Sequence, residues 1–153
     1  MCRSMSNAAR LVFSLFIVLN FVFSPMKGEA SEEKPFAEVS VVLQISDGDP
    51  FKQTLVLNVA NNLIKHYGVD KINIEIVAFG PGLRLLFADN VNGDRIQGLK
   101  VSGVRFSACN NTIRNMTKKL GKEPSLNSLA VRVSSGVARI IELKQAGYML
   151  IKP

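Results

Sequence analysis

The residue with the most evident chemistry in this sequence is Cys109, which lies in the stretch Gly103-Val-Arg-Phe-Ser-Ala-Cys109-Asn-Asn-Thr-Ile-Arg-Asn-Met116. The pattern predicts a short strand over residues 104–108 that runs directly into the first turn of a helix. Unpaired N–H groups and the helix dipole favour negative charge at that junction, and therefore thiolate over thiol. A free cysteine also behaves as a small buried hydrophobe, so a reactive and a structural interpretation are both open.

The first 30 residues have the pattern of a secretory signal peptide. Arg3 and Arg10 supply a positive start, residues 11–23 form an apolar run, and Gly28 and Ala30 are the small residues that a signal peptidase recognises. The apolar run is shorter than the roughly 20 residues that span a bilayer. We therefore predict that residues 1–30 are cleaved and that the protein is periplasmic or secreted, without membrane attachment after cleavage. An uncleaved anchor is the alternative.

Cleavage would change the charge and the cysteine content of the chain. The formal net charge would fall from +7 to +5, because residues 1–30 contain three basic residues and one acidic residue. A mildly basic exported protein suits anionic small molecules, and the absence of a basic-aromatic pattern argues against nucleic acid. Cys109 would be the one remaining cysteine, so no internal disulfide could form. In an oxidising compartment such a thiol is expected to be buried or used.

The rest of the chain alternates strand and helix patterns. After a charged linker over residues 31–37, one domain is predicted over residues 38–153. Strands are expected at 38–45, 71–79, 104–108, 129–133 and 148–152. Helices are expected at 50–67, 94–100 and 111–120, with a last one capped by Ser134 or Ser135 and ended by Gly147. This alternation predicts an α/β fold with a mostly parallel five-stranded sheet and helices on both faces.

Two apolar segments lead to more specific expectations. In the first helix Asp49 is the expected N-cap before Pro50, and Phe51 and Leu55 are expected to extend the buried stripe. Asp47 and Asp49 fit turn and cap roles better than metal ligation. Residues 83–87 are more apolar than one amphipathic helix needs, so some of them are expected to face another subunit.

Sites in such sheets gather beyond the C-terminal ends of the strands, where the Asp47 loop, the Gly80-Pro-Gly82 turn and Cys109 are all expected. Gly80 and Gly82 could leave N–H groups free for an anion, although a plain tight turn is the more frequent explanation. The acidic loop after the first strand is not a phosphate loop, so a flavin or nucleotide enzyme is disfavoured and no cofactor is expected. His66, the sequence's one histidine, has no evident link to Cys109, and no cluster has metal-ligand spacing.

Three blocks of the sequence are informative together: Phe79-Gly-Pro-Gly-Leu-Arg-Leu-Leu86, the stretch around Cys109, and Ser135-Gly-Val-Ala-Arg-Ile-Ile-Glu-Leu-Lys-Gln-Ala-Gly-Tyr148 through Pro153. With these blocks in order, essentially the whole mature chain resembles the DsrE/DsrF-like (YchN-like) family. The resemblance implies a flavodoxin-like three-layer α/β/α fold and homo-oligomers, often trimers or hexamers. Some members relay sulfur: a cysteine after the third strand, which matches Cys109 by position, carries it as a persulfide to the next protein.

The expected function is therefore sulfur binding or relay on Cys109, with a sulfur donor or acceptor protein as partner. Backbone N–H groups of Asn110, Asn111 and Thr112 would stabilise the charge, and the guanidinium of Arg114 would lie nearby. The alternative is a non-catalytic oligomeric binding module in which Cys109 is structural and residues 83–87 form an interface or a small apolar pocket.

Overall fold

The structure, a computed structural model, describes residues 34–153. The predicted signal peptide and the first part of the predicted linker lie outside the described residues. The elements are β1 (Val39–Ile45), α1 (Pro50–Tyr67), β2 (Ile72–Ala78), the 3-10 helix η1 (Gly80–Leu86), α2 (Gly93–Val101), β3 (Arg105–Cys109), α3 (Asn110–Leu120), β4 (Ala130–Val133), α4 (Gly136–Gln145) and β5 (Met149–Ile151). The predicted alternation of strands and helices is confirmed.

The five strands form one sheet in the order β4-β3-β2-β1-β5, and every neighbouring pair is parallel. The chain steps outward from β1 to β4, and β5 then returns to the other side of β1. All C-terminal strand ends consequently lie along one edge of the sheet. The reversal between β1 and β5 makes the end of these two strands a topological switch point, where α/β proteins often bind ligands.

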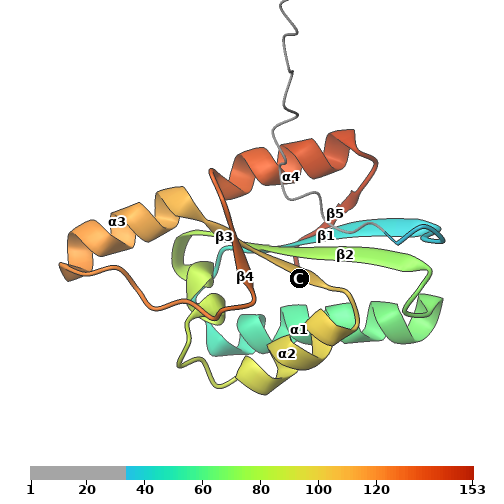
Figure 1. The fold of residues 1–153 in the computed structure, drawn as a ribbon, viewed down its shortest axis with the longest axis horizontal. Coiled ribbons are helices and arrows are strands. Elements are labelled where there is room, and N and C mark those ends of the chain that lie inside the picture. The colour runs from blue at the N-terminus through green and yellow to red at the C-terminus, as the bar shows by residue number, and fades with distance from the viewer. Residues whose placement is uncertain (1–33) are drawn as a thin grey trace, which may run out of the picture.

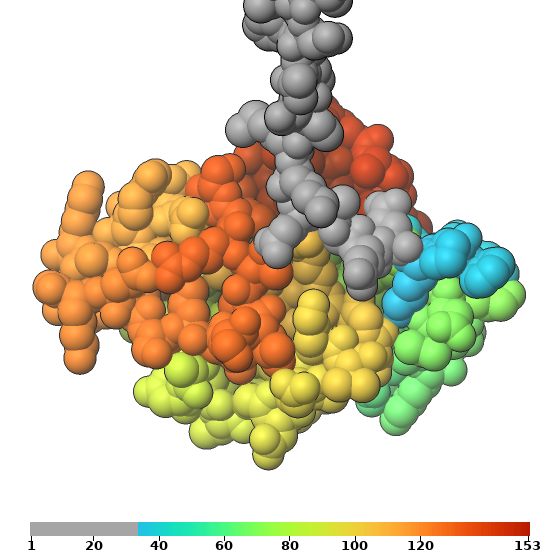
Figure 2. Space-filling view, viewed as in Figure 1, coloured from blue at the N-terminus to red at the C-terminus, as the bar shows by residue number. Residues whose placement is uncertain are grey.

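Helices cover both faces of the sheet, so the predicted flavodoxin-like three-layer α/β architecture is confirmed (Figure 1). One face carries the larger apolar core, to which α1, α2 and η1 contribute. The other face carries α4, with a smaller core of Val42, Val77, Ile140, Leu143 and Tyr148. The helix α3 and the loop after it project at one end of the molecule (Figure 2). Among residues 34–153 no helix is long and apolar enough to cross a membrane.

The loop before α1 has the predicted turn and cap roles. The side chain of Asp49 accepts a hydrogen bond from the Phe51 N–H at 2.8 Å, with Pro50 at the first helical position. Asp47 accepts from the Asp49 N–H at 3.0 Å and forms an ion pair with Lys52. Both carboxylates are therefore explained by the local geometry of the turn.

The prediction that Phe51 and Leu55 extend the buried stripe of α1 is wrong, since their side chains are 86% and 44% exposed. The inner position of the first turns is occupied by Gln53 instead. Its amide donates to the Gly48 carbonyl and accepts from Asn90, which satisfies a buried polar group. Residues two positions away on a helix point to the opposite side, so burying Gln53 turns both neighbours outward.

The apolar segment 83–87 also differs from its prediction. Leu83, Leu85 and Leu86 are fully buried in the core of their own chain, so they offer no surface to another subunit. The reason is that η1 is a 3-10 helix that packs against β2 and β3, which buries more of its side chains than one face of an α-helix would. Phe87 is half-buried and ends the segment.

Lys34, at the start of the described residues, is attached to the N-terminal edge of the sheet. Its N–H donates to the side chain of Asn73 at 3.0 Å, and its ammonium group donates to the carbonyls of Val69 and Ser102. Burial lowers the pKa of Lys34, an effect partly opposed by the negative charge of Asp70. The end of the predicted linker is thus fixed to the domain at this residue.

Candidate functional site

Three segments that are distant in sequence meet beyond the ends of β1, β2 and β3. Gly82 lies so close to the end of β1 that a Cβ there would be 2.4 Å from the Ile45 carbonyl oxygen. The Gly80 N–H donates to the hydroxyl of Thr112 on α3 at 2.9 Å. The Asp47 loop, the Gly80-Pro-Gly82 turn and the start of α3 therefore share one rim, as the order of strands and turns predicted.

The N–H groups of the two glycines are engaged within the protein. Gly80 donates to Thr112, and Gly82 donates to the Phe79 carbonyl oxygen at 3.1 Å. The interpretation in which they cradle a substrate anion is therefore disfavoured, and the tight-turn interpretation accounts for them. Gly82 permits the close approach of the backbone to β1. Gly80 has a positive φ of 53°, which glycine adopts without strain, and its N–H holds the Thr112 hydroxyl in place.

Cys109 is the last residue of β3 and the N-cap of α3, and it is 4% exposed. Burial alone would raise the pKa of its thiol. The nearby donors, namely the N–H groups of Gly136, Thr112 and Asn111 and the Thr112 hydroxyl, oppose burial and lower the pKa below its ordinary value, although the Cys109 side chain makes no capping hydrogen bond to α3. The thiol is thus surrounded by donors that favour the thiolate.

The Thr112 hydroxyl connects the turn to the thiol. Its oxygen accepts the hydrogen bond from the Gly80 N–H, which leaves its own hydrogen available for the sulfur of Cys109. A hydroxyl rotates freely in the absence of such a partner. The turn after β2 therefore orients a donor toward the sulfur.

The N-terminus of α4 is the second helix start at this sulfur. Ser135 caps α4, and its hydroxyl accepts from the Ala138 N–H at 3.4 Å. A Cβ on Gly136 would lie 3.1 Å from the Phe79 side chain and 3.3 Å from the Cys109 Cβ. The missing side chain lets the start of α4 pack closely against Cys109, so that the N-termini of α3 and α4 both lie next to this residue.

Gly136 is a functional candidate that the sequence reasoning missed. The signal was present, because Ser135-Gly136 follows the strand β4 just as Cys109 ends β3. The two loops come together only because β4 pairs with β3, with Cys109 opposite Val133. That pairing is a property of the sheet order and not of any local pattern.

The other predicted binding residues surround the start of α3. Asn111 contributes its N–H to the thiol, and its side chain accepts a hydrogen bond from the guanidinium of Arg114. Arg114 is exposed and Asn110 is half-buried. A direct role of Asn110 or Arg114 toward the sulfur stays a prediction.

A cavity of about 530 Å³ lies on the far side of Thr112, which is part of its wall, whereas Cys109 is not. Its lining combines the cationic side chains of Arg84 and Lys119 with apolar ones, among them Phe87 and Met116. A volume in this range is typical of small-molecule pockets. The cavity suits a ligand with both a negative charge and an apolar part.

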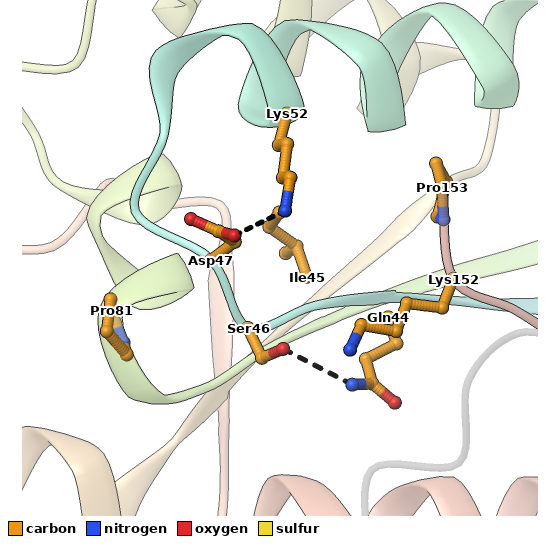
Figure 3. A pocket seen from close by; sticks show the side chains of 8 residues that line it. All are labelled: Gln44, Ile45, Ser46, Asp47, Lys52, Pro81, Lys152 and Pro153. Carbon is orange, nitrogen blue, oxygen red and sulfur yellow. Dashed lines mark hydrogen bonds and ion pairs between the residues drawn. The ribbon is translucent and has the colours of Figure 1, made fainter.

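A second cavity, of about 310 Å³, lies at the ends of β1 and β5, the switch point of the sheet (Figure 3). Figure 3 shows Lys52 directed at Asp47 across its mouth, and Gln44 donating to Ser46. A hydrogen bond from Lys52 lowers the pKa of Asp47, and the same pair raises the pKa of Lys52. The Asp47 carboxylate is unfavourable for an anion, and the lining contains neither a thiol nor an imidazole.

Metal and imidazole chemistry find no support in the described part of the chain. Residues 34–153 contain no group of three or more His, Cys, Asp or Glu side chains that could hold a metal ion. His66 is exposed near the end of α1, where its ring contacts Tyr67 edge to face at 4.7 Å.

The comparisons with known proteins show a relative among the solved structures. No family model matches the sequence, and no curated protein matches it. A solved structure does: the protein of unknown function MTH1491 from Methanobacterium thermoautotrophicum is 30% identical, with a TM-score of 0.69. The match covers 76% of this chain and the whole of that one. This chain belongs to the MTH1491 family.

Membership in the MTH1491 family supports the α/β fold and leaves the chemistry open. MTH1491 is described as a protein of unknown function, so nothing about sulfur, partners or location can be taken from it. The function must therefore be argued from the geometry around Cys109.

Proposed function

We propose that this protein binds sulfane sulfur as a persulfide on Cys109 and passes it to an acceptor, as some members of the DsrE/DsrF-like family do. The observation that carries the proposal is the position of Cys109 between the N-termini of α3 and α4, where nearby N–H groups and the Thr112 hydroxyl lower the pKa of its thiol. The thiolate is the nucleophile in thiol–disulfide chemistry, so a lowered thiol pKa increases the reactive fraction near neutral pH.

The proposed reaction is an exchange without net oxidation. The Cys109 thiolate attacks the outer sulfur of a donor persulfide R–S–SH, the S–S bond of the donor breaks, and R–S⁻ leaves. Cys109 then carries the sulfur as Cys–S–SH. An acceptor thiolate attacks the outer sulfur in the same way, takes it as a persulfide and restores the Cys109 thiolate.

The cavity beside Thr112 is the proposed approach for the donor. Arg84 and Lys119 would attract an anionic donor, and Phe87 and Met116 would pack against its apolar part. The donor class that fits is therefore a small anionic organic persulfide. Export after cleavage of residues 1–30 and assembly into a homo-oligomer remain part of this proposal.

The direct test is to incubate the protein with glutathione persulfide and to measure its intact mass. The expected result is a gain of one sulfur atom, lost on reduction and absent in Cys109→Ser. The proposal fails if wild-type Cys109 gains no sulfur while the native protein is still alkylated at Cys109 by iodoacetamide.

A second candidate function follows from the low exposure of the thiol. At 4% exposed, Cys109 also fits a structural residue in a non-catalytic oligomeric binding module. That candidate predicts a thiol that iodoacetamide cannot reach until denaturant is added, and a Cys109→Ser variant that changes stability alone. Sedimentation of the purified protein would measure the subunit number, for which a trimer or hexamer is expected.

A further inference from the structure

A buried ion cluster lies on the α4 face of the sheet. The Glu75 side chain on β2 is 2% exposed, and its two oxygens accept from the Nε and Nη2 of Arg139 on α4, both at 2.8 Å. The Ser107 hydroxyl on β3 donates to the same carboxylate at 2.6 Å, and the Nε of Arg105 lies 3.6 Å from it. One carboxylate thus joins β2, β3 and α4.

This cluster adjoins the thiol site on two sides. Side chains alternate along a strand, so Arg105, Ser107 and Cys109 of β3 lie on the same face of the sheet. On α4, Arg139 is three residues after Gly136, about 4.5 Å along the helix axis. Arg139 is therefore in the same turn of α4 as Gly136, which packs against Cys109.

Ile140 and Leu143, the buried apolar side chains of α4, also hold this helix to the sheet. The start of α4 lies close to the thiol site, because a Cβ added to Gly136 would be 3.1 Å from the Phe79 side chain and 3.3 Å from the Cys109 Cβ. A bidentate guanidinium–carboxylate contact fixes both the distance between the two groups and their relative orientation. Apolar packing or a lysine does not fix both.

We propose that Glu75 and Arg139 are a positioning pair, which holds the first turn of α4, and with it the positive end of the helix dipole, against Cys109. The pair acts through Gly136 and does not touch the sulfur. This proposal deepens the proposed function, because it concerns the same sulfur atom. It also explains why a buried charge pair is present where apolar residues of similar volume could give comparable stability.

The test must separate the effect of the position of α4 on the thiol pKa from the direct electrostatic effect of the charged side chains. The charged side chains on the elements packed around Cys109 include Glu75, Arg105 and Arg139 on the α4 face, Arg114 and Lys119 on α3, and Arg84 on η1. Removing one charge would change the thiol pKa directly, whatever happens to α4. The informative substitution is Arg139→Lys, which keeps the charge and loses the two-pronged contact.

The measurement is the rate of Cys109 alkylation by iodoacetamide as a function of pH, followed by mass spectrometry. In Arg139→Lys we expect the midpoint of the pH profile to rise and the rate near neutral pH to fall about tenfold, as for loss of one charge-assisted hydrogen bond. Arg132→Lys is the matched control: Arg132 pairs with Glu123 at an exposed site, and its substitution should leave the midpoint unchanged.

Glu75→Asp provides a second variant, since it keeps both charges and shortens the carboxylate side chain. The proposal is overturned if either variant, folded by circular dichroism, has the wild-type midpoint. The wild-type protein gives a test that needs no variant: the amide NMR signal of Gly136 must shift with the titration of Cys109, and its failure to do so also overturns the proposal. A wild-type protein that takes no sulfur but passes these tests would refute the proposed function and leave the positioning pair standing.

Discussion

Replacing Thr112 with valine should separate the chemistry of the thiol site from its packing. The two side chains have nearly the same shape, so the change removes the hydroxyl that contacts Cys109 and little else. The Gly80 N–H also loses its acceptor, because its hydrogen bond ends on the Thr112 oxygen at 2.9 Å. Two effects are therefore expected, one on the thiol pKa and one on stability.

The magnitudes follow from the hydrogen bonds that are lost. A hydrogen bond to a charged group contributes about 1.5–3 kcal/mol, which corresponds to a rise of about 1–2 in the pKa of Cys109. Alkylation at a pH below both midpoints should slow by about 10–100-fold. The unpaired Gly80 N–H should lower the free energy of unfolding by about 1–3 kcal/mol, measurable by urea denaturation.

The assay is the iodoacetamide rate of Cys109 over a range of pH, with the labelled peptide identified by mass spectrometry. The midpoint of the profile reports the pKa, whereas the plateau at high pH reports access to the sulfur. Thr112→Ser is the control, since it keeps the hydroxyl and should keep the midpoint. An unchanged midpoint in Thr112→Val, or an equal rise in Thr112→Ser, would refute the assignment of the hydroxyl as a donor to the thiolate.

Three further outcomes are expected. Gly82→Ala should destabilise the fold by about 1–3 kcal/mol in urea, because its Cβ would lie 2.4 Å from the Ile45 carbonyl oxygen; wild-type stability would contradict this contact. The lowered pKa of Cys109 implies that the free energy of unfolding rises with pH between the folded pKa and about 8.5. The stability contributed by the thiolate is complete above that range and is lost as the pH falls through the folded pKa. Cys109→Ser should lack this slope in urea titrations at several pH values. The double variant Arg84→Gln/Lys119→Gln should slow sulfur loading from glutathione persulfide several-fold and reduce its salt dependence, while alkylation by neutral iodoacetamide on the high-pH plateau, where the thiol is fully ionised, stays unchanged; equal slowing of both reactions would point to damage at the thiol itself.

Much of the fold could be predicted because its signals are local. The strands appear as apolar runs between turns, and Asp49-Pro50 marks the start of α1 with a cap that the structure confirms. Helix-sheet alternation then limits the topology to a parallel sheet. The position of Cys109 between β3 and α3 follows from the same local reasoning.

The predictions of burial and contact failed where a side chain packs against residues that are distant in the sequence. Gln53 is buried because Gly48 and Asn90 satisfy its amide, and no apolar pattern in α1 records those partners. Leu83 and its neighbours are in the core because η1 is a 3-10 helix packed on the strands. Gly136 meets Cys109 because β4 lies beside β3. Contacts of the thiol site that join different segments of the chain depend on which strands lie side by side. One segment of the sequence read alone does not show this.

The combination of burial and donors around Cys109 is the strongest argument for a thiol that is used. A structural cysteine can be buried as a neutral group among apolar side chains, and it needs no hydrogen-bond donors. Here the Thr112 hydroxyl, the N–H groups at the start of α3 and the N–H of Gly136 lie near the sulfur and lower the pKa of the thiol. A neutral thiol would gain little from them, since strong hydrogen bonds form to the charged sulfur. The absence of a side chain at Gly136, which lets α4 start next to Cys109, therefore supports the proposal that the site stabilises negative charge, as a thiolate or as a persulfide.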